Sequence, residues 1–338
     1  MHIPDGYLSP YTSGAMYAAS LPFLVRASRN VKKVLNSRMI PLISVFSALS
    51  FVIMMFNIPL PGGTTGHATG IAISAIVLGP WASILSATVA LVIQALFFGD
   101  GGILSLGANI FNMGIVMSLT GYFLYRLLVR SKDSARKKIV IASISGYISV
   151  NIAALLTAVE LGIQPMLYKN SLGQALYFPY NLYVSVPVMM IGHLTIAGLA
   201  EGIVTGLVFA WILRVQPDLI FSEGKSLTSK KLFKFSFLGL IFLILLTPLG
   251  LLAPGTAWGE WGREELALLG LSYIPAGFDK WSSFWRAPIP DYDIPGILNP
   301  TLLYIFSACL GVLLTGLFIF FLLSVINKLG GKKKSNHE

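Results

Sequence analysis

The sequence predicts an all-α membrane protein with nine transmembrane segments, and three observations lead to this class. Of the 338 residues, 55% are apolar and only 11% are charged, whereas soluble domains carry about 25% charged residues. The mean hydropathy is +0.76. Long stretches without a charged side chain recur, the longest over 39–99. This composition excludes a soluble enzyme, a disordered chain and a disulfide scaffold, and the single Cys309 excludes a cysteine-cluster metal site.

The predicted segments follow these charge-free stretches along the chain. A membrane-crossing helix needs about 20 apolar residues, so residues 39–99 can cross three times, with breaks at 57–66 and 78–80. The nine segments are 10–25, 39–56, 68–79, 81–98, 103–125, 139–161, 176–213, 235–252 and 300–327. Segment 10–25 is the most polar and is expected to pack against protein more than lipid. Segment 176–213 is too long for one straight crossing, so we expect it to tilt, to kink at Pro187 or to begin outside.

Lysine and arginine predict the orientation of these segments. With nine crossings, 20 of the 24 basic residues fall on one side of the membrane and four on the other. The cytoplasmic side carries the excess, so the C-terminus is predicted inside and the N-terminus outside. The net charge of +10 then reflects topology, and we expect no nucleic-acid partner. The predicted outer loops are 57–67, 99–102, 162–175 and 253–299.

The chain is predicted to divide into two membrane parts. A basic, serine-rich stretch at 214–234 indicates a cytoplasmic linker. It separates a seven-span unit at 1–213 from a two-span hairpin at 235–327, and a basic cytoplasmic tail follows at 328–338. The hairpin carries the large, tryptophan-rich outer loop at 253–299, which is much longer than usual connections.

The usual signatures of an enzyme are missing. A phosphate-binding loop needs a glycine five positions before the glycine of its Gly-Lys-Ser, but Leu219 holds that position before Gly224-Lys225-Ser226. His193 lacks the second histidine of a zinc-protease helix, and no Gly-x-Ser-x-Gly elbow occurs. We therefore expect no enzymatic activity, and no ATP hydrolysis by such a loop.

The start of the chain, Met1-His2-Ile3-Pro4-Asp5-Gly6, offers a chelating geometry. It lacks the basic first region of a signal peptide, so we expect Met1 to persist at the outer face. The Met1 amine and the His2 amide nitrogen close a five-membered ring around a metal ion. The same amide and His2 Nδ1 close a six-membered ring. One further imidazole would complete a planar four-nitrogen site, which favours Ni(II) or Cu(II) over zinc; without that imidazole, His2 is better explained by chance.

His67 is the candidate for the fourth nitrogen. It lies in the Gly-rich stretch 61–70, where an outer loop meets a predicted span, and polar groups at membrane depth are functional candidates. The alternative is a histidine that only binds a backbone carbonyl at the start of a helix. Thr64 and Thr65 are candidate pocket residues in the same loop.

Five other polar residues have two interpretations each. Asp5 is either an acceptor for an imidazole N–H or a solvent-facing carboxylate. Asn109 and Asn112 share a helix face and either line the metal pocket or hydrogen-bond to neighbouring helices. His193 and Glu201 also share a face, and we expect a buried structural pair there, with a functional role left open.

Several motifs occur together in the first part of the chain. They are Met1-His2-Ile3-Pro4-Asp5-Gly6-Tyr7-Leu8, the stretch 61–70, Gln94-Ala95-Leu96-Phe97-Phe98 and the stretch 101–114. Residues 1–213 thereby resemble the nickel/cobalt substrate-capture (S) components of energy-coupling-factor transporters, the NikM/CbiM family. The second part, with Pro288-Ile289-Pro290-Asp291-Tyr292-Asp293-Ile294-Pro295-Gly296, is similar to the small auxiliary NikN-type subunit. The resemblance implies a seven-helix S-component bundle fused to a NikN-like module, in the plasma membrane of a prokaryote.

The resemblance also implies a division of labour. This chain, embedded in membrane lipid, would take Ni²⁺ or Co²⁺ from outside as the transported substrate, with Met1, His2 and His67 as ligands. A transmembrane coupling (T) protein and ATP-binding-cassette (ABC) ATPase subunits would drive uptake. The alternative is a stand-alone secondary metal transporter or channel, which needs charged groups across the membrane, and the predicted spans hold only Glu160 and Glu201 as acids. The choice between nickel and cobalt stays open.

Overall fold

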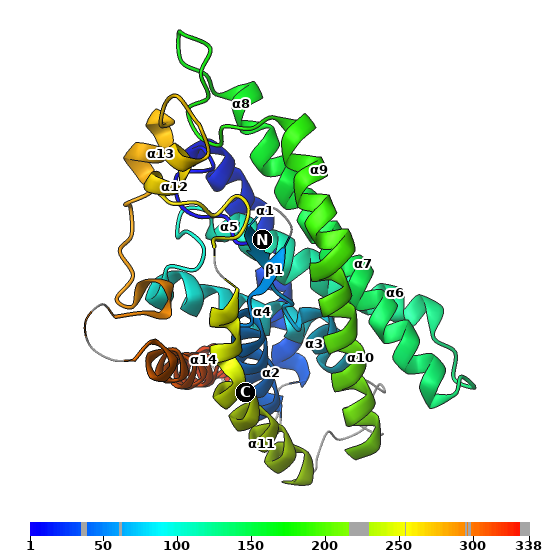
Figure 1. Cartoon of the computed structure of the whole chain (residues 1–338). Helices are drawn as coiled ribbons and strands as arrows, with labels where there is room; N and C mark the ends of the chain where they lie inside the picture. Colours follow the sequence, from blue (N-terminus) through cyan, green and yellow to red (C-terminus); the bar gives the residue numbers. More distant parts are fainter. Residues whose placement is uncertain are drawn as a thin grey trace.

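The fold is almost entirely helical, as the composition predicts (Figure 1). The computed structural model describes residues 1–34, 39–60, 63–215, 230–253, 255–294, 296 and 299–331. Most of the predicted linker, with Leu219 and Gly224-Lys225-Ser226, and most of the basic tail lie outside the described residues. Within the described residues, the one sheet is an antiparallel hairpin of β1 (Ile58–Leu60) and β2 (Thr64–Gly66).

The first part of the chain is a helical bundle with two centres of packing. One centre is α4, which is surrounded by α1, α2, α3 and η2. The other is α7, which packs against α6, α9 and α10. Strand β2 leads into α3. Its helices are α1 (Pro10–Val34), α2 (Met39–Met54), α3 (Ile71–Leu78), α4 (Pro80–Ile93), the π-helical η1 (Gln94–Phe98), α5 (Leu106–Asn109), the π-helical η2 (Ile110–Val116), α6 (Met117–Leu128), α7 (Ala135–Gly162), α8 (Gln164–Leu167), α9 (Leu182–Gly192), the π-helical η3 (His193–Ala197) and α10 (Gly198–Val215).

The helices indicate a multi-pass membrane protein. Four helical stretches, Pro80–Phe98, Ala135–Leu167, Leu182–Val215 and Pro300–Val325, have the length and apolar character to cross a bilayer. Met39–Met54 and Phe237–Leu252 are apolar but shorter. The nine predicted crossings are therefore not nine full-length helices in the described part of the chain.

The predicted crossing at 68–79 shows why. It is α3, which has eight residues, all of them buried, and measures about 12 Å against a hydrocarbon core of roughly 30 Å. Residues 65–70, directly before α3, are not helical and are buried, and non-helical backbone at membrane depth is tolerated only where protein surrounds it. The loop that carries His67 therefore lies inside the bundle and not above it.

The long predicted segment 176–213 is one interrupted helix. It comprises α9, η3 and α10 over Leu182–Val215, with Pro187 inside α9. The extra residue of a π-helical turn commonly bends a helix and occurs at functional sites. Residues 176–181 precede this helix, and a π-helical turn begins at His193, six residues after Pro187.

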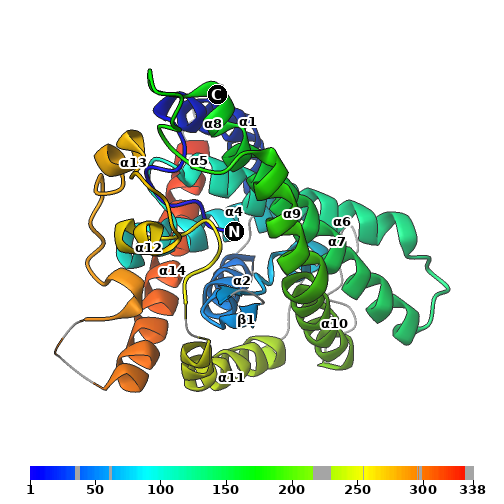
Figure 2. The same cartoon turned by 45° about the horizontal axis from the view of Figure 1, so that its top comes forward.

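The second part contains the two apolar helices of the predicted two-span unit, with shorter helices in the long connection between them. Its helices are α11 (Lys230–Leu246), the 3₁₀-helical η5 (Thr247–Leu252), α12 (Arg263–Leu268), α13 (Ala276–Trp281), the 3₁₀-helical η6 (Pro290–Tyr292) and α14 (Pro300–Gly331). Helices α11 and α14 each pack more against α2 than against each other. Figures 1 and 2 show the segment between them, with α12 and α13, beside the N-terminus. The long outer loop is what allows the two helices to separate.

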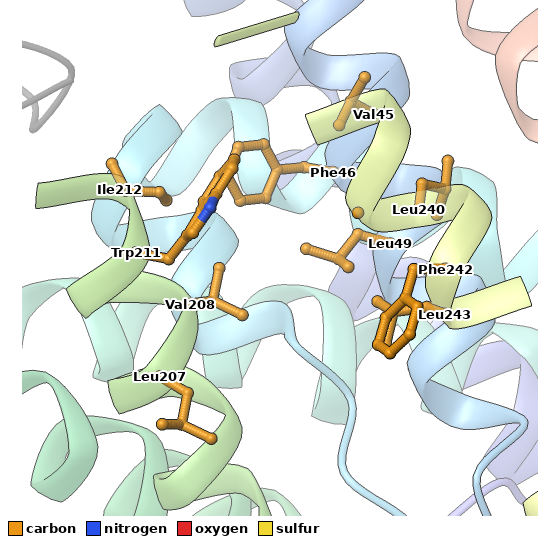
Figure 3. Close-up of a pocket in the computed structure, with 11 residues that line it drawn as sticks. Val45, Phe46, Leu49, Leu207, Val208, Trp211, Ile212, Leu240, Phe242 and Leu243 are labelled. Atoms are coloured by element: carbon orange, nitrogen blue, oxygen red, sulfur yellow. The ribbon is translucent and has the colours of Figure 1, made fainter. Parts of the chain in front are cut away.

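An apolar cavity of about 270 Å³ lies between α2, α10 and α11 (Figure 3). Its lining residues include Phe46, Leu49, Trp211 and Leu243, and none carries an ionisable side chain. Because metal ions need nitrogen, oxygen or thiolate ligands, this cavity is not a metal centre. The polar chemistry gathers around the N-terminus instead.

Candidate metal centre

The first nine residues are a buried, irregular segment inside the protein. In Figures 1 and 2 the N-terminus lies among α4, α9 and the chain that follows α11. Of these nine residues, only Pro4 is partly exposed and the rest are buried. The first residues of a domain are often poorly ordered unless other elements hold them, and this segment is enclosed by other parts of the protein.

Hydrogen bonds hold the main chain next to His2 from two sides. The Ile3 N–H donates to Asn109 Oδ1 at 2.8 Å, and Asn109 Nδ2 donates to the Ile3 carbonyl at 3.1 Å. The Gly102 N–H donates to the same carbonyl at 2.9 Å. A Cβ at Gly101, where φ is +87°, would lie 2.9 Å from Asn109 Nδ2. The glycines at 101 and 102 therefore let the loop approach the terminal segment closely.

The rest of the segment is anchored to two different loops. The Asp5 carboxylate accepts the N–H groups of Ile103, Leu104 and Ser105 at 2.7–3.3 Å. Burial raises the pKa of Asp5, and these N–H groups oppose that shift. The Tyr7 hydroxyl donates to the Trp261 carbonyl at 2.8 Å. The terminal segment thus joins the loop after η1 to the outer loop of the second part.

His2 and His67 lie next to each other. Their ring centroids are 5.2 Å apart, and both side chains are buried. Two imidazoles on one ion, with metal–nitrogen bonds of about 2.0 Å, have centroids on the order of 4–6 Å apart. The pair therefore has the spacing for shared coordination.

The hydrogen bonding of both rings leaves nitrogen lone pairs free. His67 Nδ1 lies 3.0 Å from the Ala68 carbonyl, which can only accept, so Nδ1 carries the proton and Nε2 keeps its lone pair. The two interpretations of His67, as a metal ligand and as a histidine bound to a backbone carbonyl, are therefore compatible. The bond to the carbonyl orients the ring so that Nε2 can coordinate. His2 Nε2 has no hydrogen-bond partner among the described residues, whereas His2 Nδ1 lies 3.0 Å from Asp100 Oδ1.

Both imidazoles are neutral near pH 7. Burial lowers the pKa of His2 to about 4, and Glu260 opposes part of this shift. Burial lowers the pKa of His67 to about 3, with a further contribution from His2. A metal ligand must be unprotonated, so both side chains are in the coordinating form at physiological pH.

Two carboxylates that the sequence did not single out join this centre. The Met1 ammonium group lies 3.0 Å from Glu260 Oε1, and His2 Nδ1 lies 3.0 Å from Asp100 Oδ1. One donor atom from each of His2, Asp100 and Glu260 lies within 4.8 Å of the others. Gln94 Nε2 and the Tyr292 hydroxyl donate to Asp100 Oδ2, at 2.9 and 2.6 Å.

A buried glutamate fixes the loop that carries His67. Glu201 Oε2 on α10 accepts from the Thr69 N–H at 2.6 Å, the Gly70 N–H at 3.1 Å and the Thr69 hydroxyl at 3.2 Å. These groups begin α3, whose first N–H groups have no partner within the helix. The glutamate thereby ties the chain two residues after His67 to a long helix.

The remaining predicted residues have structural contacts. Asp5 binds the 103–105 main chain and not an imidazole, and it is buried, so neither of its two interpretations fits. Asn109 binds the terminal segment, whereas Asn112 donates to Thr157 and Glu160 on α7.

Three other polar residues lie near the centre without joining it. Thr64 donates to the Thr256 carbonyl, and Thr65 bridges to Ala257, so both dock the outer loop. His193 Nδ1 bonds the Met189 carbonyl, whereas Glu201 bonds the 69–70 loop, so these two are not a pair.

Comparisons with known proteins identify the family of this chain. Residues 2–219 match the family described as cobalt uptake substrate-specific transmembrane region, and residues 233–328 match the PDGLE domain. The chain is 44% identical over 329 residues to the fused nickel transport protein NikMN of Rhodobacter capsulatus, covering 93% of this chain and 94% of that protein. It is 41% identical over 326 residues to the probable fused nickel transport protein LarMN of Lactiplantibacillus plantarum, covering 94% and 96%.

A solved structure is also similar. The crystal structure of a transition metal transporter matches with a TM-score of 0.61 and 47% identity, over 70% of this chain and 98% of that one. The relatives are named as transport proteins and not as enzymes, which confirms the prediction from the missing catalytic motifs. The chain therefore belongs to the CbiM/NikM family of nickel and cobalt transport proteins, in a fused form whose second part is a PDGLE, NikN-like domain.

Proposed function

We propose that this chain is the substrate-capture subunit of an energy-coupling-factor importer and binds Ni²⁺ or Co²⁺ from the outside. The ligands in this proposal are the Met1 amine, the His2 amide and imidazole nitrogens, and His67. The observation that carries it is the burial of a free chain start against a second uncharged imidazole, with the ring centroids 5.2 Å apart. Packing of the terminus alone does not require two buried histidines whose ring nitrogens are not all hydrogen-bonded.

Binding would proceed by exchange of protons for the ion. The Met1 amine and the His2 amide must lose protons to coordinate, so metal binding releases protons. Both imidazoles are already neutral and need no deprotonation. The hydrogen bonds of Asn109 to Ile3 hold the two chelate rings in place, which lowers the conformational cost of closing them.

Release to the inside would require the terminal segment or the His67 loop to move. Residues 1–9 are buried apart from Pro4, which is partly exposed, so release requires a conformational change, and in this proposal an external source of energy drives it. The sequence lacks a phosphate-binding loop, and we assign the energy to a transmembrane coupling protein and ABC ATPase subunits. The NikN-like part, over 235–327, covers the site from the outside in this scheme, with the N-terminus outside and the C-terminus in the cytoplasm.

Nickel is the preferred ion in this proposal. A planar set of four nitrogens suits Ni(II) and Cu(II) better than zinc or magnesium. The relatives that match nearly the whole chain are named as nickel transport proteins. Cobalt is the alternative substrate, as the name of the matching family suggests.

The proposal is tested by blocking the terminal amine. We expect a chain extended by Gly-Ser before Met1 to lose tight nickel binding in titrations of the purified protein. A His67→Ala variant should lose it as well, with the yellow absorption band of planar Ni(II) absent in both. The matched control is a chain extended at its C-terminus, which should bind like the native protein. Full nickel affinity in the N-terminally extended chain would show that the amine is not a ligand.

A further inference from the structure

The donor atoms beside the nitrogen ligands are themselves arranged to hold a cation. We infer that His2, Asp100 and Glu260 form a docking site for a divalent ion, which shares His2 with the nitrogen site and receives the ion before it reaches the four nitrogens. This inference rests on the proposed function, because it adds a step ahead of the same binding event. The ligand is a divalent transition-metal ion that accepts carboxylate and imidazole donors.

The geometry of the three groups fits one ion. Their donor atoms lie within 4.8 Å of one another. Two ligands on one ion, each bound at about 2.0–2.2 Å, lie up to roughly 4.4 Å apart. A movement of a few tenths of an ångström therefore closes the three donors around a cation.

The side chains of His2, Asp100 and Glu260 converge, and some of their donor atoms are available to bind a metal ion. His2 is only 2% exposed, its Nε2 has no hydrogen-bond partner among the described residues, and its Nδ1 lies 3.0 Å from Asp100 Oδ1. Asp100 Oδ2 accepts from Gln94 and Tyr292, which leaves Oδ1 directed at His2. A carboxylate fixed through one oxygen presents the other as a preorganised ligand.

A polar cavity borders two of the three groups, Asp100 and Glu260. It has a volume of about 540 Å³, and His67, Asp100 and Glu260 line it together with two further acids, Glu265 and Asp291. No lysine or arginine is among its lining residues. A cleft lined by charges of one sign concentrates counter-ions and speeds their association.

The docking site and the nitrogen site differ in what they require of the protein. The nitrogen site needs the Met1 amine, which is paired with Glu260. It also needs the His2 amide nitrogen in its deprotonated form. Carboxylate oxygens and an imidazole can take a hydrated ion directly. On docking, the ion replaces the ammonium group at Glu260. That group must then lose a proton to solvent before it can coordinate in the next step, and His2 belongs to both sites.

The inference also gives the fused second part a chemical role. Glu260 and Tyr292 lie within residues 233–328, which match the PDGLE domain. One ligand and one orienting hydroxyl of the docking site therefore come from this domain, and the others come from the capture domain. Neither domain has the complete docking site on its own.

Mn²⁺ is the probe that separates the two sites. It prefers oxygen donors such as carboxylates, and of the first-row divalent ions it has the lowest affinity for a nitrogen site. We expect the native protein to bind one Mn²⁺ in electron paramagnetic resonance titrations, and Asp100→Asn with Glu260→Gln to abolish that signal. Glu264→Gln is the control, because Glu264 is exposed in the same loop. Absence of Mn²⁺ binding in the native chain, or its persistence in the double variant, would overturn the inference.

Nickel loading gives the second readout. In stopped-flow experiments at low Ni²⁺, the double variant should load at least tenfold more slowly, whereas Glu264→Gln should load like the native chain. Equal loading rates would overturn the docking step. His67→Ala separates the two proposals, because it should retain Mn²⁺ binding and lose tight Ni²⁺ binding. If His67→Ala keeps tight Ni²⁺ binding, the nitrogen site is wrong even where Mn²⁺ binding persists.

Discussion

Asn109 is the residue whose side chain most directly shapes the terminal segment. It makes two hydrogen bonds to the main chain of Ile3, one residue after His2. Each such bond contributes about 0.5–1.5 kcal/mol. We expect Asn109→Ala to reduce nickel affinity about tenfold or more in titrations, because the chelating segment is no longer held in its binding conformation.

Asn112 provides the matched control three residues further along the chain. It bonds Thr157 and Glu160 on α7, and its described hydrogen bonds do not reach the terminal segment. Asn112→Ala should therefore lower the thermal unfolding temperature while nickel affinity changes less than about twofold. Equal losses of affinity in the two variants would mean that Asn109 acts only through the stability of the bundle.

The two histidines predict how the stability of the metal-free protein depends on pH. Their folded pKa values, about 4 for His2 and about 3 for His67, lie below the ordinary 6.5. Between pH 6.5 and those values the unfolded chain binds more protons than the folded one, so stability falls as the pH falls. A tenfold difference in proton affinity between the folded and unfolded chain corresponds to about 1.4 kcal/mol of stability.

Thermal unfolding at pH 7 and pH 5 measures this effect. The native, metal-free protein should lose more stability between these values than the double variant His2→Gln, His67→Gln. The difference should be on the order of a few kcal/mol. The same loss in both proteins would show that the imidazoles are not buried in the folded state.

At the residue scale, the sequence predicts ligands that are close together in the chain and misses contacts between residues that are far apart in the chain. The chelate of Met1 and His2 depends on adjacent residues, and His67 stands out as a lone histidine beside a span. Glu260 reaches the Met1 amine across 259 positions, and its loop holds several acids that the sequence alone does not distinguish. The contact depends on how the second part folds over the first, which no local pattern encodes.

Helix α10 is the element that connects the His67 loop with the opposite end of the bundle. Glu201 supplies the carboxylate that holds Thr69 and Gly70, and α10 ends at Val215. Loss of three hydrogen bonds to a carboxylate costs several kcal/mol by the usual contribution of about 1.5–3 kcal/mol each. We expect Glu201→Ala to weaken nickel binding at least tenfold in titrations, and Glu201→Gln to weaken it less.

Glu160 offers the comparison for this prediction. It is also a buried glutamate, on α7, but its described side-chain contact is with Asn112 and not with the His67 loop. Glu160→Ala should destabilise the fold with little change in nickel affinity. If both alanine variants lose affinity equally, Glu201 has no specific role in positioning His67.

At the element scale, helix positions are better predicted than helix lengths. The apolar runs locate α2, α4, α7 and α14, because long charge-free stretches have few alternatives in a membrane protein. The shortness of α3 is not predicted, because residues 68–79 carry no charged side chain along their whole length. What shortens the helix is the Gly-rich loop drawn into the bundle by Glu201, a tertiary contact. The π-helical turns likewise depend on packing.

The orientation of the whole molecule is testable with the single native cysteine removed. In a Cys309→Ser background, Arg263→Cys lies in the outer loop and Lys137→Cys at the start of α7. We expect a membrane-impermeant maleimide to label Arg263→Cys in intact cells and Lys137→Cys only after the membrane is opened. The reverse pattern would place the N-terminus in the cytoplasm.

In the whole molecule, segments from the first and the second part of the chain meet at one site. The terminal segment, the hairpin of β1 and β2, the loop after η1 and the outer loop of the second part all meet around Met1 and His2. The sequence predicts these four segments on the same side from the distribution of basic residues, but not their contacts. The separation of α11 and α14 around α2 is also beyond prediction, since the length of the outer loop permits many arrangements.

The central claim is that the chain start is a metal ligand. An anomalous difference map of the nickel-loaded protein, collected at the nickel absorption edge, tests it most directly. We expect one strong peak within about 2 Å of the Met1 amine, the two His2 nitrogens and a His67 ring nitrogen, with the Met1 amine parted from Glu260. A peak held by carboxylates alone, with the amine still paired to Glu260, would contradict the claim.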